Sequence, residues 1–380
     1  MFITYFKQSE IEEKIFESFL FGKANAKAKK DTTGWKTIHI QEKNPFSDNN
    51  IFVPAKDRTR WLLKARKLAK EAAEIQEKIP VENRFHVYEI PKKSGGMRKI
   101  EEPIPEIMSF LNKVKDFLES DMRFHPHPAS FAYVKQKNTL DAIRVHQKAE
   151  NQWFLKLDFH DFFGSITLPL TLERLWEIYP FGHMRNYVNF EECMVKILET
   201  AFDWKGQLPQ GTPLSPTLSN ICMLRSDFEI SESCKERGIT YTRYADDMLF
   251  SAKERNALSS IKGWVNHVTP RELKLNPDKT RLGSIAGRNW NLGLMLNKDN
   301  NITVGKKNKD VMRATLYQMA MKFKNREAIG AEATSKFVGL YNYYRYIEPE
   351  YFDRMTTRVS KKTGVDLFQV FHLSGGQVNR

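Results

Sequence analysis

The spacing of hydrophobic residues along the chain predicts both helices and strands. Between residues 105 and 119 the apolar positions recur every three or four residues, which places them on one face of a helix. Polar residues mark two helix starts: Asn138 with Asp141 in the first turn, and Ser215 as the cap before Pro216. These patterns predict helices at about 56–77, 105–119, 139–149, 187–202, 215–238, 254–268 and 305–345.

Shorter segments alternate between apolar and polar residues and therefore predict strands. Residues 85–90, FHVYEI, alternate in this way, and the Ser-Gly-Gly that follows predicts a hairpin turn before a return strand that starts at Arg98. Residues 153–159, WFLKLDF, predict a strand that runs into an acidic residue. Residues 239–252 predict a strand, a turn at Ala-Asp-Asp and a second strand.

The composition adds length and charge to this pattern. The 380 residues are enough for two or three subdomains around a sizeable core, and a hydrophobic content of 41% excludes a disordered chain. Lys and Arg number 60 against 46 Asp and Glu, which gives a net charge of +14. This charge indicates a polyanionic partner such as nucleic acid, although a solvated basic surface on an ordinary enzyme would look the same.

The sequence argues against several classes of protein. The three cysteines lack the spacing of a disulfide scaffold or a Cys-based zinc site. His125 and His127 have no Cys or third His nearby, so they are interpreted as part of a rigid loop and not as metal ligands. Acidic residues interrupt the N-terminal segment, and no uncharged apolar run approaches the roughly 20 residues of a membrane span. We therefore expect a cytoplasmic protein with no membrane partner.

Two predicted helical segments carry a large excess of positive charge. Residues 56–70 contain seven Lys or Arg against one Asp, and residues 306–326 also contain seven against one. A solvated helix face is one interpretation, and contact with nucleic-acid phosphates is the other. Under the second interpretation the candidate nucleic-acid-binding residues are Arg58, Lys64, Lys67, Lys306, Lys307 and Arg313.

Three carboxylates stand at the ends of predicted strands. Asp158 closes the strand that begins at Trp153, and Asp246 and Asp247 occupy the turn between two later strands. An Asp-Asp pair in a turn is by itself more often structural, because Asp side chains cap backbone N–H groups. If the strand ends adjoin in one sheet, however, the three side chains can converge on Mg²⁺, which prefers oxygen ligands. Two such ions roughly 4 Å apart would support nucleotidyl transfer.

A series of segments between residues 85 and 350 resembles, in order, the motifs of reverse transcriptases, particularly the bacterial enzymes of group II introns, retrons and phage-defence systems. PKKSGGMRKIEEP and SFAYVKQKN resemble two fingers motifs, FLKLDFHDFFGSI palm motif A, LPQGTPLSPTLSN motif B, and YADD the metal-binding box. LNPDKTRL, NWNLGLML and FVGLYNYYRYIEPEYF resemble the next palm motif, the primer grip and the thumb. Because the retron marks N-A-x-x-H and V-T-G are not matched, the chain looks most like the stand-alone, defence-associated enzymes.

The resemblance implies a role for each matched residue. Asp158, Asp246 and Asp247 would hold two Mg²⁺ ions, or Mn²⁺, with the backbone carbonyl of Phe159 as a further ligand. Phe163 would exclude the ribose 2′-hydroxyl and so select dNTPs, a core aromatic being its alternative interpretation. The residues expected against the incoming dNTP are Lys92, Lys93, Arg98, Phe159, Phe163, Gln210, Gly211 and Tyr244. Lys279 matches the lysine that precedes the primer grip and is expected to contact nucleic acid.

The resemblance also implies a fold. It would be a right-hand polymerase of class α+β, with fingers, an antiparallel palm sheet backed by helices, and a helical thumb. The expected division is a basic N-terminal extension over residues 1–84, fingers and palm over 85–300, and a thumb with a C-terminal tail over 301–380.

The implied reaction is RNA-directed DNA synthesis, with an RNA template, dNTPs and a DNA product as partners. We expect the template to be a specific non-coding RNA and the biological role to be antiviral defence. A retron-type enzyme and untemplated, repetitive or protein-primed DNA synthesis by the same site stay open. A basic RNA-binding protein without chemistry is the non-enzyme alternative, and an oligomer or a partner protein also stays open.

Overall fold

The computed structural model describes residues 53–92, 95–287 and 291–367, together with the backbone of three short strands nearer the N-terminus. These strands are β1 (Thr4–Phe6), β2 (Lys27–Lys30) and β3 (Lys36–His39), which pair antiparallel in the order β1-β3-β2. The chain divides into two compact units that alternate along the sequence. The first comprises Met1–Lys137, Leu157–Met248 and Ser260–Lys279, and the second comprises Asn138–Lys156, Leu249–Ser259 and Thr280–Arg380. The boundaries expected near residues 84 and 300 stay predictions.

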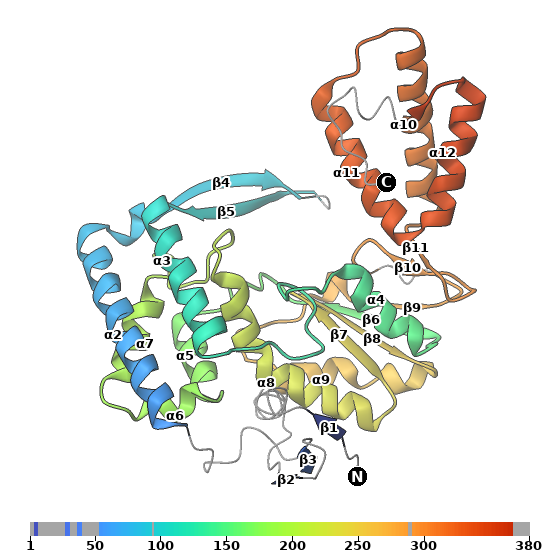
Figure 1. The fold of residues 1–380 in the computed structure, drawn as a ribbon. Coiled ribbons are helices and arrows are strands. Elements are labelled where there is room, and N and C mark those ends of the chain that lie inside the picture. Colours follow the sequence, from blue (N-terminus) through green and yellow to red (C-terminus); the bar gives the residue numbers. More distant parts are fainter. Residues whose placement is uncertain are drawn as a thin grey trace. The chain divides into compact units, whose positions relative to one another are not determined.

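A four-stranded sheet carries the predicted catalytic segments. Its strands are β6 (Trp153–Asp158), β7 (Thr240–Tyr244), β8 (Asp247–Ala252) and β9 (Arg281–Ser284), hydrogen-bonded in the order β7-β8-β6-β9. Strands β6 and β9 are antiparallel, and β7 and β8 form a tight hairpin. Helices α8 (Ser215–Glu236) and α9 (Ile261–Val268) back this sheet (Figure 1). The predicted α+β class, with an antiparallel sheet backed by helices, is confirmed.

The remaining elements of the first unit are a hairpin and a group of helices. Strands β4 (Phe85–Pro91) and β5 (Met97–Pro103) form the hairpin expected around Ser-Gly-Gly. The helical segments are α2 (Ala55–Lys78), η1 (Val81–Asn83), α3 (Pro105–Asp116), which continues as the π-helical turn η2 (Phe117–Asp121), α5 (Leu168–Trp176), α6 (Phe181–Arg185), α7 (Phe190–Glu199) and η4 (Pro277–Lys279).

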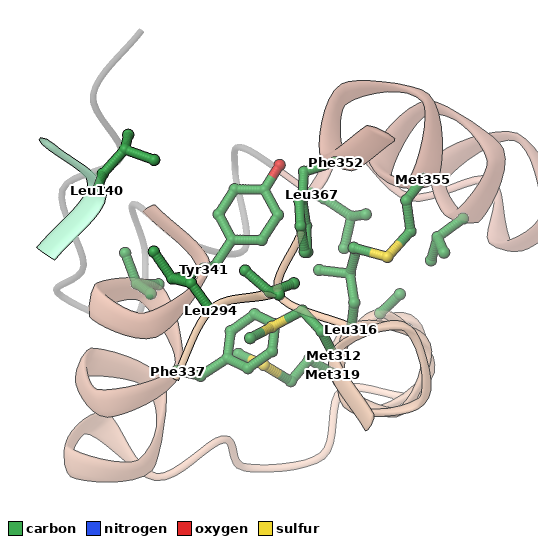
Figure 2. Close-up of a cluster of buried hydrophobic side chains, with 14 of the residues drawn as sticks. Leu140, Leu294, Met312, Leu316, Met319, Phe337, Tyr341, Phe352, Met355 and Leu367 are labelled. Atoms are coloured by element: carbon green, nitrogen blue, oxygen red, sulfur yellow. The ribbon is translucent and has the colours of Figure 1, made fainter. Parts of the chain in front are cut away.

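The second unit is built mainly from helices. Its further elements are α4 (Thr139–Lys148), η3 (Arg255–Leu258), β10 (Met295–Leu296), β11 (Ile302–Thr303), α10 (Lys306–Lys324), α11 (Ala331–Ile347) and α12 (Pro349–Thr363). Its core gathers around Leu316, Phe337, Tyr341 and Phe352 from these three C-terminal helices (Figure 2). The hydroxyl of Tyr341 lies 2.6 Å from Oγ1 of Thr356, so this buried aromatic also has its polar end satisfied.

Local signals account for most helix boundaries, with three exceptions. One is the helix expected at 305–345, which is divided into α10 (Lys306–Lys324) and α11 (Ala331–Ile347), with Arg326 between them at a φ of +58°. Asn138 caps α4 as predicted: its side chain accepts from the backbone N–H of Asp141, whose carboxylate accepts from the N–H of Asn138. The prediction that Ser215 caps α8 is wrong, since Leu214 is the N-cap and Thr212 Oγ1 accepts from the N–H of Ser215 at 3.0 Å. The helix predicted at 254–268 is interrupted between η3 and α9, where the Ser259 hydroxyl donates to a backbone carbonyl.

Candidate active site

The end of β6 and a loop from later in the sequence form one side of the site. Asp158 closes the strand and is only 3% exposed. Its backbone carbonyl accepts from the N–H of Asn276 at 2.7 Å, and Phe159 bridges to Leu275. This pairing returns the chain so that the Nζ of Lys279 donates to Asp158 Oδ1 at 2.8 Å. The structure thus brings Lys279 directly to a predicted metal ligand.

The turn between β7 and β8 carries the other two carboxylates, and a hydrogen bond from Arg243 holds its backbone. Ala245, which precedes Asp246, has a φ of +57°, a left-handed conformation that is uncommon for a residue with a side chain. The fully buried Arg243 donates through Nη1 to the carbonyl oxygen of Ala245 at 3.0 Å. Because this carbonyl lies inside the turn, Arg243 helps to fix the backbone that presents Asp246 and Asp247.

Helix α8 holds Arg243 in place through a buried ion pair. The guanidinium donates from Nε and Nη2 to the two carboxylate oxygens of Asp227, at 2.8 and 2.6 Å, and from Nη2 to Asn220 Oδ1 at 2.9 Å. The hydroxyl of Tyr241 donates to the same carboxylate at 2.7 Å. Arg243 and Asp227 both have no exposed surface. A bidentate pair of this kind fixes orientation as well as charge.

The three carboxylates are close enough to influence one another. Burial raises the pKa of Asp158 to about 6, opposed by the hydrogen bond from Lys279 and reinforced by the charge of Asp246 and by the hydrogen bond and charge of Asp247. In turn, the hydrogen bond to Asp158 raises the pKa of Lys279. A cation between these groups would relieve their repulsion, so the donor set suits a hard divalent ion.

The side chains are not already arranged around a vacant metal position. Among the residues that the structure describes, no group of three or more His, Cys, Asp or Glu side chains is placed so that it could hold a metal ion. At Asp158, the ammonium group of Lys279 is paired with one carboxylate oxygen at 2.8 Å. The carboxylate oxygens are the kind of donor that Mg²⁺ prefers. In this structure, however, Asp158 contacts the ammonium group of Lys279.

Phe163, the predicted sugar gate, has an aromatic neighbour that the sequence did not single out. The ring of Tyr133 meets that of Phe163 edge-on, with centroids 6.4 Å apart. Tyr133 has a φ of +62° and is 53% exposed. Burial of its hydroxyl end raises the pKa of Tyr133, and the charge of Asp246 raises it further. Strained, half-exposed aromatic residues beside carboxylates are candidates for function.

The fingers hairpin and the loop before α8 contact each other. The N–H of Glu101 donates to the carbonyl of Gln210 at 2.7 Å. Gly211 has a φ of +121°, and a Cβ at that position would lie 2.9 Å from Ile100 Cγ2. Because Gly211 has no side chain, its backbone can lie close to β5. This contact explains the glycine without a nucleotide, and the predicted approach to a nucleotide is a second explanation.

The other residues expected to contact the dNTP fall on the same unit. Arg98 lies on β5 and influences the Tyr133 hydroxyl electrostatically, and Tyr244 ends β7. Lys92 is exposed at the turn of the hairpin, where its backbone N–H donates to Gly96. Lys93 lies outside the described residues. The substrate roles of all these residues stay predictions.

The predicted nucleic-acid-binding residues differ in how free their side chains are. On α2, Arg58 stacks on Tyr187 with 4.9 Å between the guanidinium carbon and the ring centroid, and Lys64 forms an ion pair with Asp121. Lys67, on the same helix, is exposed. On α10, Lys306 and Lys307 are exposed in the first turn, and Arg313 is paired with Asp310 at 2.8 Å. Two of the α2 candidates therefore already contact protein groups.

Sequence reasoning missed Tyr133 and the pair formed by Arg243 and Asp227. Tyr133 lies in the segment SFAYVKQKN, which resembles a fingers motif, so the motif itself was a usable signal. Arg243 immediately precedes the YADD box, but nothing local shows that its partner lies 16 residues earlier on α8.

Within the described part of the chain, no helix is both long enough and apolar enough to cross a membrane.

Comparison with known proteins identifies the family. Residues 90–333 match the model of the family described as reverse transcriptase (RNA-dependent DNA polymerase). The chain is 29% identical over 291 residues to the retron Ec83 reverse transcriptase of Escherichia coli, covering 73% of this chain and 88% of the relative. It is 26% identical to the retron Ec73 enzyme of the same organism, over 71% of this chain and 85% of the relative.

Solved structures of telomerase are also similar. The apo telomerase of Candida Tropicalis aligns with a TM-score of 0.45 and 12% identity, over 94% of this chain and 67% of that one. The chain does not match the retron motifs N-A-x-x-H and V-T-G. The relatives it matches are nevertheless retron reverse transcriptases, so the absence of these motifs does not exclude a retron-type enzyme. With the family model covering most of the motifs and the carboxylates gathered at the strand ends, the chain belongs to the reverse transcriptase family of RNA-directed DNA polymerases.

Proposed function

We propose that this reverse transcriptase extends a primer 3′ end at Asp158, Asp246 and Asp247, through two-metal-ion catalysis directed by an RNA template. The observation that carries the proposal is the mutual interaction of these carboxylates, from the ends of two neighbouring strands, in a chain of this family. Unused carboxylates in contact would only repel one another, so their conjunction favours a site that takes up cations.

The chain's own groups define how the site would work. Two Mg²⁺ ions, held by the three carboxylates and the carbonyl of Phe159, would activate the attacking 3′-hydroxyl and stabilise the leaving pyrophosphate. Lys279 would leave Asp158 and turn its ammonium group toward nucleic-acid or nucleotide phosphates. Arg98 and Lys92 would hold the triphosphate, because Arg suits bidentate phosphate contact and Lys supplies a point charge.

Phe163 would select the sugar. Its ring, contacted by Tyr133, would fill the space that a ribose 2′-hydroxyl needs. Gln210 is tied to β5 through its backbone carbonyl, which would keep its loop in place beside the incoming nucleotide.

For the template we propose a specific structured RNA, and for the biological role antiviral defence against phage. The similar E. coli proteins are named retron reverse transcriptases, which supports a retron-type enzyme. The exposed Lys67, Lys306 and Lys307 supply phosphate contacts whose strength should fall steeply with salt. RNA shape would supply the specificity.

RNA-templated primer extension tests the catalytic proposal. Asp246→Asn should lower the rate by about a hundred-fold or more, since losing a metal ligand removes several kcal/mol of transition-state stabilisation. Asp299→Asn, an exposed aspartate in the second unit, is the matched control and should keep the wild-type rate. Near-normal synthesis by folded Asp246→Asn would overturn the proposed site.

A separate experiment tests the RNA partner. The protein is purified from its host and the RNA that accompanies it is sequenced, for wild type and for the Lys67, Lys306 and Lys307 reversal to Glu. One enriched RNA, lost in the triple variant, is the expected result, whereas a heterogeneous population in both would contradict the proposal. For the defence role, phage protection should disappear both with Asp246→Asn and with deletion of that RNA.

A further inference from the structure

A cavity of about 480 Å³ lies between α10 and α12, entirely within the second unit. Its apolar floor consists of Ala314 from α10 and of Met355 and Val359 from α12. Met355 and Val359 are almost fully buried, whereas Ala314 is exposed and, being small, leaves the space open. The volume falls within the range of roughly 300–1,000 Å³ that small-ligand pockets occupy in proteins.

The rim of the cavity is cationic. Arg354, Arg358 and Lys362 line it from α12 at intervals of four residues, and therefore stand one above the other on the same face. Like charges at this spacing repel one another and destabilise an isolated helix. The stripe consequently does not stabilise α12 by itself.

These cations also lack strong partners within the protein. Among the described residues, neither Arg358 nor Lys362 forms an ion pair, and the nearest carboxylate to Arg354 is the exposed Glu350 at 4.0 Å. The one acidic residue that lines the cavity, Asp310, is paired with Arg313 from its own helix. The rim thus presents a positive charge that an anionic ligand would balance.

Two tyrosines form the sides. The Nζ of Lys362 lies 5.1 Å from the ring centroid of Tyr317, and the Nζ of Lys309 lies 4.3 Å from that of Tyr351. Each ring therefore holds an ammonium group near the cavity. The combination of an apolar floor, aromatic sides and a cationic rim fits a ligand with a flat apolar part and a concentrated negative charge.

We propose that this cavity binds a nucleotide bearing a terminal phosphate, with the base against the floor and the phosphate at Arg354, Arg358 and Lys362. A phosphate monoester carries about −1.5 to −2 charges near neutral pH and so matches several clustered cations better than the single charge of an internal phosphodiester. The ligand could be a free nucleotide or the 5′-terminal nucleotide of an RNA strand, since both present this chemistry. The site is independent of the catalytic carboxylates.

Equilibrium binding to 3′-labelled single-stranded RNA tests the proposal. Two RNAs of one sequence are compared, one with a 5′-monophosphate and one with a 5′-hydroxyl, using the full chain with Asp246→Asn and no dNTP. The 5′-phosphorylated RNA should bind about ten-fold more tightly, as expected for charge-assisted hydrogen bonds to one added phosphate. Competition by AMP at millimolar concentration would assign the site to free nucleotides, and its absence to strand ends.

Matched variants locate the effect. Arg358→Ala should abolish the preference for the 5′-phosphate, whereas Lys361→Ala, an exposed residue of α12 outside the cavity, should keep it. Ala314→Trp, which fills the floor without changing a charge, should abolish the preference as well and covers the case in which Arg358→Ala misfolds. Equal binding of the two RNAs by wild type, or an equal loss for both RNAs in Arg358→Ala, would show ordinary phosphodiester contact and overturn the proposal.

Discussion

The buried pair of Arg243 and Asp227 should govern both the stability of the first unit and the geometry of the YADD turn. In Arg243→Met the apolar stem is kept, but four hydrogen bonds from the guanidinium are lost: two to Asp227, one to Asn220 and one to Ala245. The Asp227 carboxylate then stays fully buried, with the Tyr241 hydroxyl still donating to it but no positive partner. Uncompensated buried charge of this kind costs about 3–5 kcal/mol.

Urea unfolding at neutral pH measures this cost. Arg271→Met, an exposed arginine of the same unit, is the control and should change the unfolding free energy by less than about 0.5 kcal/mol. In the double variant Arg243→Met with Asp227→Leu, the buried charge is gone, so part of the lost stability should return. That recovery separates the cost of an unpaired charge from the loss of packing.

A kinetic measurement addresses the turn itself. Because Arg243 contacts the YADD turn through the Ala245 carbonyl, we expect kcat to fall more than KM for the dNTP changes, in protein that is still folded. Arg243→Lys retains the charge without the planar fork and should recover stability more than kcat. A loss of stability below about 1 kcal/mol in Arg243→Met, the range of exposed ion pairs, would refute the reasoning.

Three further predictions concern single positions: the gate at Phe163, Gly211 and His127. Phe163→Ala should raise the incorporation of rNTPs relative to dNTPs, and Tyr133→Ala should do so to a smaller extent by removing the ring beside it; an unchanged ratio in steady-state competition would reject the gate. Gly211→Ala should cost about 1–3 kcal/mol of unfolding free energy, because the new Cβ meets β5 at a φ of +121°; wild-type thermal stability would contradict this. Burial lowers the pKa of His127 to about 4 from its ordinary 6.5. As the pH falls, the unfolded chain therefore binds a proton at His127 before the folded chain does. The contribution of neutral His127 to the free energy of unfolding is complete above pH 6.5 and falls by on the order of 3 kcal/mol as the pH drops to 4. Denaturant titrations from pH 7.5 to 4.5 should show a shallower decline in His127→Asn than in wild type, and parallel curves would argue against the assignment.

Local features were predictable where one short stretch of sequence determines them. The capping box of Asn138 and Asp141 lies within four residues, and the hairpin of β4 and β5 follows from alternation around a glycine turn. The error at Ser215 arose because its hydroxyl donates to the backbone carbonyl of Pro209 at 2.7 Å, in the preceding loop, and so does not accept from an N–H of the helix. Local propensity does not encode that choice.

Features that join distant parts of the chain could not be predicted in the same way. The ion pair between Lys279 and Asp158 spans 121 residues, and the approach of Gly211 to Ile100 depends on how the hairpin meets the loop before α8. The resemblance placed Lys279 near nucleic acid, but it contained no statement about which carboxylate the ammonium group touches. Such contacts depend on tertiary packing, which a motif records only indirectly.

The way the two units alternate along the sequence has a consequence for how the chain acquires its structure during synthesis. The core of the second unit combines Leu140, Phe154 and Leu249 with residues of the C-terminal helices, such as Phe337 and Phe352. The early segments therefore leave the ribosome long before their partners exist, and their apolar side chains stay exposed until the last helices are made. Contacts of such large sequence separation also slow folding, because a long loop must close before any of them form. Nascent chains stalled before α11 should accordingly bind chaperones through residues 138–156, whereas the full chain should not.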